Sequence, residues 1–410
     1  MKSKIPFALP PLRHFRLISR FLESIAISPG IPLAWLQLSR SRNRLIIAIA
    51  GIAFACFLMF MQLGFQAALY DSNTLMHRSL KADLILMSPQ AQNISNMESF
   101  PRRRLYQAMN FDGVTSAVPL YTDRGNWRNP DNQKQTEVLF FAFNPAESVA
   151  NLEGIQESIN KLKLTDTMLF DRRSDGEYEA TLAALTEGKT LITEVQNRQV
   201  RLEGLFTLGA SFAGDSNAIV SDITFLRLFP NRNLSEVNVG LVTLSPAKDP
   251  QQMAAALQAY LPEDVKVLTL PEFVEFEKDY WANSTPIGFI FTLGTAIGFL
   301  VGLVIVYQIL YADVSDHLSE YATLKAIGFR DNYFLVVVLQ EALMLAVLGF
   351  IPGLIISAGL YQIAAEATML PIVMTVDRAI LVLVLTIVMC GVSGGIALRR
   401  LRSADPAEIF

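Results

Sequence analysis

Long charge-free apolar runs alternate with segments of mixed polarity along the 410-residue chain. A membrane-spanning helix needs roughly 20 apolar residues, and four runs are long enough. They lie at 45–70, 280–312, 332–365 and 379–398, and Glu341 is the single charged residue inside them. The first run begins too late and is too long for a cleaved signal peptide. The pattern predicts four transmembrane helices, at 45–70, 281–312, 332–362 and 379–398.

The segment 71–280, between the first and second of these helices, has the mixed pattern of a globular domain. Short apolar or alternating runs are typical of strands, and two segments follow helical spacing. The expected strands are 83–87, 114–121, 137–143, 237–244 and 265–270, and the expected helices are 102–109 and 250–261. We therefore expect a large α+β domain of two lobes, with a β-rich insertion at 150–220 that contains the runs 191–195 and 200–206.

Composition agrees with a membrane protein that has a substantial aqueous part. Charged residues make up 18% of the chain, against about 25% in soluble proteins. The net charge of −4 argues against a general nucleic-acid binder, and two cysteines are too few for a disulfide-stapled module. Cys56 and Cys390 fall inside predicted membrane helices, where we expect packed apolar side chains; a disulfide or a metal pair is the alternative.

The distribution of charge predicts how the chain is oriented. Residues 1–44 contain eight Lys and Arg against Glu23 alone, and the end of the chain adds Arg399, Arg400 and Arg402. Lys and Arg concentrate on the cytoplasmic side of membrane proteins, so both termini are expected there, and four spans permit this. Residues 71–285 hold 20 basic and 28 acidic side chains and are expected outside. The tail 399–410 and the segment 313–331 would be cytoplasmic, and the short loop 363–378 extracytoplasmic.

Sequences that resemble catalytic motifs all lie in unsuitable contexts. Gly188-Lys189-Thr190 resembles the end of a phosphate-binding loop, but Ala183 stands where its first glycine should be. The segment 391–395 fits the pattern G-x-S-x-G, yet it lies inside a predicted membrane helix, where small residues suit helix packing better. The three histidines form no metal-binding pattern. We expect no catalytic residue, no cofactor site and no metal site in this chain.

Two features inside the predicted membrane helices could have a function. Gly294, Gly298 and Gly302 recur every four residues, which places them on one helix face and lets another helix approach closely. That second helix could belong to this chain or to another copy of it. Glu341 is an ionisable group inside a membrane helix. We expect it either to hydrogen-bond to a neighbouring helix near the cytoplasmic boundary or to serve a substrate or a proton.

Four segments of the chain, taken in order, are informative together. They are LAWLQLSR at 33–40, SEYATLKAIGF at 319–329, Glu341-Ala342 and the closing DPAE at 405–408. This series resembles the permeases of FtsX/MacB-type ABC transporters. The first segment is similar to the amphipathic helix that precedes the first span in that family, the second is similar to the family's cytoplasmic segment, and the last two fall where the family carries such residues. The segments 31–38, 100–106 and 205–209 look closer still to the cyanobacterial DevC branch.

The resemblance implies a bacterial inner-membrane permease with a MacB-like periplasmic core domain at 71–280. ATP would be bound by a separate cytoplasmic ABC ATPase, and two copies of this chain would pair. A periplasmic membrane-fusion adaptor and a TolC-like outer-membrane channel would complete an exporter, and DevC-like members are associated with glycolipid cargo. ATP-driven motion would pass through an amphipathic stalk, 271–281, that runs into the second membrane helix. Such coupling requires that this stalk helix move as a rigid lever. The residues expected to couple to the ATPase are Glu320, Tyr321, Leu324, Lys325, Gly328 and Phe329.

Two other functions remain open at the level of sequence. An FtsX-like mechanotransmission protein would use the same coupling segment to regulate cell-wall hydrolases without transport, although that branch has a smaller outer domain. An extracytoplasmic sensor unrelated to ATPases would leave the segment 320–328 without a role.

Overall fold

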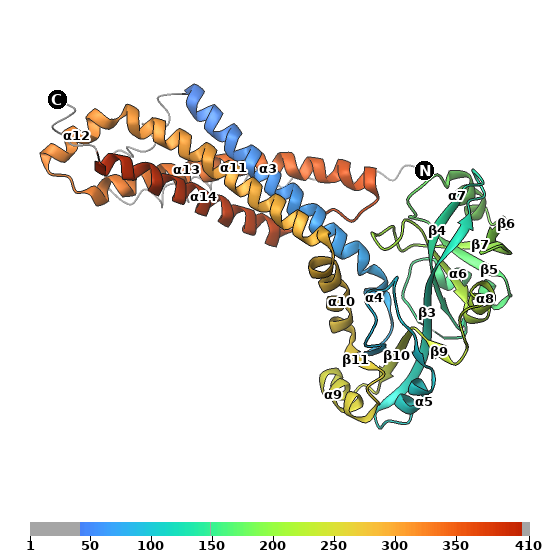
Figure 1. Cartoon of the computed structure of the whole chain (residues 1–410). Helices are drawn as coiled ribbons and strands as arrows, with labels where there is room; N and C mark the ends of the chain where they lie inside the picture. The colour runs from blue at the N-terminus through green and yellow to red at the C-terminus, as the bar shows by residue number, and fades with distance from the viewer. Residues whose placement is uncertain (1–41, 148, 404–410) are drawn as a thin grey trace. The chain divides into compact units, whose positions relative to one another are not determined.

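The computed structural model describes residues 42–147 and 149–403 (Figure 1). The amphipathic helix expected near 33–40 and the closing motif at 405–408 lie outside these residues. The chain forms two compact units. One contains the chain up to Phe57, Gly298–Leu354 and the chain from Ile380 onward, and the other contains Leu58–Ile297 and Ile355–Ala379. Each unit therefore holds part of every long helix.

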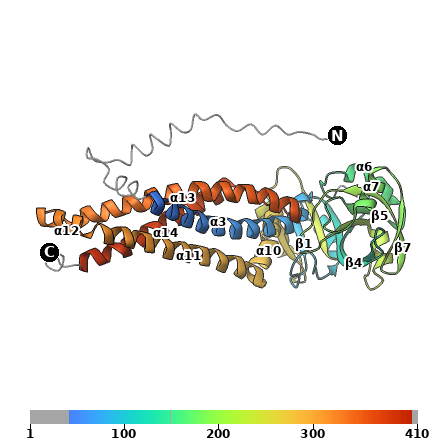
Figure 2. The same ribbon diagram turned by 90° about the horizontal axis from the view of Figure 1, so that it is seen from above.

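Four helices are long and apolar enough to cross a membrane, and a large α+β domain lies between the first and the second, which confirms the predicted fold class. They are α3 (Arg42–Asn73), α11 (Pro286–Asp316), α13 (Asp331–Thr368) and α14 (Val376–Ser403). Within the first unit their segments run side by side (Figure 2). A short helix, α12 (Leu318–Ile327), follows α11. The segment 313–331 is therefore mostly helical, and Asp313 and Asp316 belong to the last turn of α11.

Small residues bring the membrane helices of the first unit close together. A Cβ atom added at Gly349 would lie 2.5 Å from the side chain of Ile52, and one at Gly51 would lie 2.6 Å from Ile305. Polar side chains bond between or within helices: Ser393 Oγ donates to the carbonyl of Leu303 at 2.9 Å. Close backbone approach and such hydrogen bonds are the usual source of helix association in lipid.

The α+β domain is built on a nine-stranded sheet, in the order β11-β1-β10-β3-β4-β8-β5-β7-β6 (Figure 1). Its strands are β1 (Leu84–Met87), β3 (Val114–Arg128), β4 (Gln135–Phe143), β5 (Thr167–Asp171), β6 (Leu191–Val195), β7 (Arg198–Phe206), β8 (Asn217–Ser221), β10 (Val239–Leu244) and β11 (Lys266–Thr269). A separate pair joins β2 (Phe100–Pro101) to β9 (Glu236–Val237). The helices of the domain are α4 (Leu75–Ser79), α5 (Arg103–Met109), α6 (Ile155–Ser158), η2 (Ile159–Lys163), α7 (Glu179–Thr186), α8 (Asp222–Leu228), α9 (Pro250–Tyr260) and α10 (Leu270–Asp279).

Strand β3 belongs to both lobes of this domain. Its first half, to Leu120, pairs with β10, and its second half, from Tyr121, pairs with β4. Trp127 and Arg128 also pair with β6. The strands β3, β4, β8, β5, β7 and β6 thus close into a ring, which leaves no open edge between β3 and β6. The run 150–220, expected as a β-rich insertion, supplies β5, β6, β7 and β8 of this ring.

Successive residues of the strands fill two different cores. Leu84 and Leu86 belong to a core that includes residues of α5 and α9, whereas Ile85 and Met87 belong to one that includes residues of α4 and α10. Side chains alternate between the faces of a strand, so a strand buried on both faces needs a continuous apolar run. This explains why the short apolar runs of the sequence predicted these strands.

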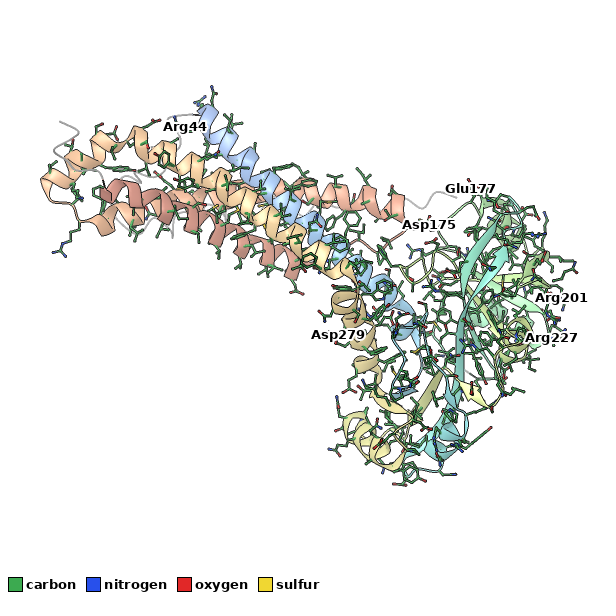
Figure 3. All side chains as sticks on the ribbon, in the orientation of Figure 1. Arg44, Asp175, Glu177, Arg201, Arg227 and Asp279 are labelled. Carbon is green, nitrogen blue, oxygen red and sulfur yellow. The ribbon has the colours of Figure 1, made fainter. Side chains whose placement is uncertain are left out.

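The stalk helix expected at 271–281 is present as α10, and its helical backbone is interrupted before the second membrane helix. A capping box begins α10, because Thr269 and Glu272 bond to each other's backbone N–H groups. The helix ends at Asp279 (Figure 3), a π-helical turn follows at Tyr280–Ser284, and Thr285 is extended, with φ −117° and ψ 154°. Pro286 starts α11 and disfavours a helical residue before it. Helix α10 and helix α11 are therefore separate helices, joined by the segment 280–285.

Candidate functional site: the short helix α12 and its apolar patch

Helix α12 has both termini defined by its sequence. Glu320 lies in the first turn and Lys325 in the last, where each charge is favourable to the helix dipole. Gly328 follows with φ +109°, a left-handed conformation that glycine adopts at little cost. The N–H of Gly328 bonds to the carbonyl of Lys325 at 3.0 Å, and the N–H of Phe329 bonds to that of Leu324 at 3.1 Å. This pair of bonds is a Schellman motif, which ends the helix sharply.

Two of the residues expected to contact an ATPase face the interior of the first unit. Tyr321 is only 2% exposed and lies in a cluster with Val314 and Phe334, and Leu324 packs against that cluster. The rings of Tyr321 and Phe334 meet edge to face, with centroids 5.4 Å apart. These side chains hold α12 against α11 and α13. Tyr321 is buried, whereas Leu324 is half-buried.

The remaining residues of the motif surround an exposed apolar surface. Ile327 is 71% exposed, Phe329 is 42% exposed, and Tyr333 at the start of α13 is 39% exposed. The rings of Phe329 and Tyr333 pack with centroids 4.8 Å apart. We call Ile327, Phe329 and Tyr333 the α12 patch. Glu320 is also exposed and Lys325 is half-buried.

Sequence reasoning missed Ile327 and Tyr333. The motif contains Ile327 directly before Gly328, and helical spacing places it seven residues after Glu320, on the same face. If the motif is divided into a buried and an exposed helix face, Ile327 falls on the exposed face and Tyr321 on the buried one.

Buried and exposed acidic groups lie beside α12. Glu341 is fully buried, and its carboxyl group faces that of Asp313, which is also buried. Among the described residues, the oxygens of Glu341 accept no hydrogen bond from another group. His317 Nδ1 lies 3.9 Å from Asp313 Oδ1, and Arg44 pairs with Asp316 at 2.6 Å (Figure 3). The structure thus places Glu341 against α11, next to the helix end that leads into α12.

The three glycines of α11, Gly294, Gly298 and Gly302, have different surroundings. A Cβ atom at Gly294 would meet the Gln62 amide group at 2.5 Å, whereas one at Gly302 would lie 2.6 Å from Ala55 Cβ. Gly298, between them, is buried. Gly294 and Gly302 therefore pack against α3 of the same chain.

The segments that resemble catalytic motifs lie in a turn of the α+β domain and within a membrane helix. Gly188 and Lys189 lie in the turn between α7 and β6, and Gly188 has φ +80°. Ser393 lies within α14. Across residues 42–147 and 149–403, no three His, Cys, Asp or Glu side chains are placed to hold a metal ion. The exposed apolar surface at this site is the α12 patch.

Comparison with known proteins identifies the membrane part. Residues 289–406 match the family model described as FtsX-like permease C-terminal, a stretch that includes α12 and most of α11, α13 and α14. The helices that form the candidate site are thus similar to the C-terminal region of FtsX-like permeases. None of the curated proteins compared with this sequence matches it.

Two solved structures are similar to part of the chain. One is the periplasmic region of MacB from Actinobacillus actinomycetemcomitans, with 11% identity over 48% of this chain and 92% of that chain, and a TM-score of 0.33. The other is the extracellular domain of the noncanonic ABC-type transporter YknZ from Gram-positive bacteria, with 14% identity over 46% of this chain and 100% of that chain, and a TM-score of 0.33.

Proposed function

We propose that this protein is the membrane-spanning permease subunit of an ABC exporter and that it transmits the motion of a separate ATPase to the α+β domain. The observation that carries the proposal is the α12 patch. A short, sharply capped helix presents exposed apolar side chains between two membrane helices, inside the region that matches the FtsX-like family. An exposed cluster of this kind is expected to bind a partner protein.

The α12 patch is suited to transmit force as well as to bind. Its exposed residues lie at the end of α12, while Tyr321 and Leu324 anchor the same helix in the cluster with Phe334. A push on Ile327 or Phe329 would therefore act on α11 and α13 through packed side chains. A coupling element needs such contiguous packing.

The topology we propose places both termini and α12 in the cytoplasm and the α+β domain outside, in the periplasm of a bacterial inner membrane. The excess of Lys and Arg before the first span supports it. The ATP site would belong to the partner, because the phosphate-loop resemblance at Gly188-Lys189 lies in the α+β domain and has no glycine at position 183.

The finer parts of the proposal are supported by the resemblance of short segments alone. They are a homodimer, a periplasmic membrane-fusion adaptor, a TolC-like outer-membrane channel, and glycolipid cargo as in DevC-like members. An FtsX-like mechanotransmission protein that regulates cell-wall hydrolases would have the same α12 patch, so the coupling test below applies to both functions. Export and wall regulation differ in whether ATP hydrolysis moves a lipid-like cargo out of the membrane.

The test is ATP hydrolysis in a reconstituted complex. The full chain is placed in nanodiscs with an ABC ATPase of the proposed partner class, and the apparent dissociation constant and the hydrolysis rate are measured for wild type and Ile327→Asp. Complete burial of an Ile side chain contributes about 1.5–3 kcal/mol, so loss of this contact should weaken binding at least about tenfold.

Val376→Asp is the matched control. Val376 is 75% exposed, it is also aliphatic, and it lies at the start of α14, on the other side of the α13 span from Ile327. The control should bind the ATPase like wild type. Absence of a complex, or equal binding by Ile327→Asp and wild type, would rule out the proposed coupling.

A further inference from the structure

Glu277, in the stalk helix α10, joins three separate segments of the α+β domain although its side chain is fully buried. Its Oε2 atom accepts the N–H of Ile94 at 2.8 Å and lies 3.2 Å from Nε2 of His77. Its Oε1 atom accepts the indole N–H of Trp281 at 2.9 Å. Burial of a carboxylate is costly unless hydrogen bonds compensate for the lost water, so the bonds from Ile94 and Trp281 are energetically significant. His77 contacts the carboxylate without a hydrogen bond.

Each neighbour belongs to a part of the fold that meets the stalk. His77 lies on α4, directly after the first membrane helix, and its ring packs on Phe273 with centroids 4.4 Å apart. Ile94 belongs to the loop 88–99, and its carbonyl accepts a hydrogen bond from Thr122 of the central strand β3. Trp281 lies in the π-helical turn that follows α10.

The end of the first membrane helix is fixed to the same domain by a second contact. Asn73, the last residue of α3, accepts the N–H of Ala213 at 3.0 Å through Oδ1 and donates to the carbonyl of Leu69 at 2.8 Å. Through Asn73 and Glu277, the continuations of the first and second membrane helices are both bonded to the body of the α+β domain.

From Tyr280 to Thr285 the backbone is not α-helical. Residues Tyr280–Ser284 form a π-helical turn, and Thr285 is extended, so the helical hydrogen-bond pattern is interrupted before Pro286. Gly288 lies so close to this turn that an added Cβ would meet the Ala282 carbonyl oxygen at 2.2 Å. Interruptions of this kind are where helices bend, and we call Tyr280–Thr285 the joint.

We propose that the contacts of Glu277 act as a clasp, by which we mean that they hold α4 and α10 rigidly against the rest of the α+β domain. Bending between the domain and the second membrane helix would then be confined to the joint. Force from α11 would then reach the domain at the joint rather than through a continuous helix. Glu277 is a positioning residue in this scheme. The proposal deepens the proposed function, but it concerns this chain alone, and it is tested without an ATPase.

The first test is hydrogen exchange of the full chain in nanodiscs, comparing wild type with Glu277→Gln. A glutamine offers one acceptor oxygen in place of two, so one of the two N–H donors loses its partner. Exchange should rise about fivefold or more in three segments that are distant in sequence: α4, the loop 88–99 and α10. Trp281→Phe removes the indole donor alone and should raise exchange in α10 and the joint only.

Glu275→Gln is the matched control, because Glu275 lies on the same helix and its carboxylate is exposed, paired with Lys278 at 3.2 Å. It should change exchange in the three segments by less than about twofold. A rise confined to α10 in Glu277→Gln would refute the clasp, and so would a uniform rise over the whole domain, because that would be ordinary destabilisation.

A distance measurement tests the joint. Spin labels are introduced as Ser235→Cys with Glu275→Cys, and as Ser235→Cys with Ile290→Cys, in a chain whose native cysteines are replaced by alanine. The first pair, from the domain to α10, should give a narrow distance distribution, and the second, from the domain to α11, a broader one. Equal widths would contradict a joint at Tyr280–Thr285. Failure of ATPase binding in the earlier test would leave these outcomes unchanged.

Discussion

Substitution of Gly302 by alanine tests whether close backbone approach holds the membrane helices together. The added Cβ would lie 2.6 Å from Ala55 Cβ, whereas ordinary contacts begin at 3.4 Å. It would also meet Met389 Sδ at 2.3 Å, but that flexible side chain can move. Helix α3 would have to shift by several tenths of an ångström, and overpacking of this kind costs about 1–3 kcal/mol.

Part of this cost is offset by helix propensity. Alanine is more favourable than glycine in a helix by about 1 kcal/mol, so we expect a net destabilisation of about 0–2 kcal/mol for Gly302→Ala. At about 2–4 °C per kcal/mol, the midpoint of thermal unfolding should fall by up to roughly 8 °C. Gly395→Ala in α14 is the control, because an added Cβ meets nothing within 4 Å there. It should raise the midpoint slightly.

The two native cysteines provide the assay. Cys56 and Cys390 are both fully buried, and Cys56 Sγ lies 3.1 Å from Thr386 Oγ1. A thiol-reactive fluorescent dye should label them only when the helices separate, so labelling during a temperature ramp reports on this part of the molecule. An equal or higher midpoint for Gly302→Ala than for Gly395→Ala would refute the packing argument.

Three further substitutions have defined outcomes. Gly328→Ala should destabilise the end of α12 by about 1 kcal/mol and lower the ATPase hydrolysis rate, whereas Gly328→Asn should cost less, because asparagine tolerates the left-handed conformation better. Gly64→Ala should lower the unfolding midpoint, because an added Cβ would meet the hydroxyl oxygen and ring atoms of Tyr361 in α13 at 2.2–2.7 Å. Gly359→Ala, where an added Cβ meets open space, should not lower it. A hydrogen bond from Arg104 lowers the pKa of Asp264. This pair should therefore stabilise the domain above the ordinary Asp pKa and lose that effect as pH falls below about 4. Unfolding of wild type and Asp264→Asn at pH 7 and pH 3 checks this; because Asp264 is exposed, the two proteins should differ in unfolding free energy by at most about 1 kcal/mol at pH 7.

Much of the fold follows from local pattern in the sequence. The charge-free runs predicted the four membrane helices, because no other local signal competes with twenty apolar residues in a row. The runs 191–195 and 137–143 became strands β6 and β4 nearly as expected. The pairing of β3 with β6, which closes the ring, could not be foreseen, because it joins residues more than sixty positions apart and depends on how the whole sheet coils.

The candidate site was predictable in part. The motif at 319–329 located α12 and its glycine cap, but the division into an inner Tyr321 and an outer Ile327 required knowledge of which neighbours pack on the helix. The joint had one signal in the sequence, the Thr285-Pro286 pair, which disfavours a helical residue before the proline. Glu277 gave no such signal, because its partners His77 and Ile94 lie almost two hundred residues earlier.

The most direct test of the central claim is photocrosslinking from the α12 patch. A photoreactive phenylalanine analogue replaces Phe329 in the full chain, which is reconstituted with an ABC ATPase of the proposed partner class and irradiated. The same analogue at Phe212 of the α+β domain is the control. Phe329 and Phe212 have similar exposure, 42% and 47%. We expect a covalent adduct with the ATPase from position 329 and none from position 212. No adduct from position 329, or equal adducts from both positions, would contradict the assignment of this protein as an ATPase-coupled permease.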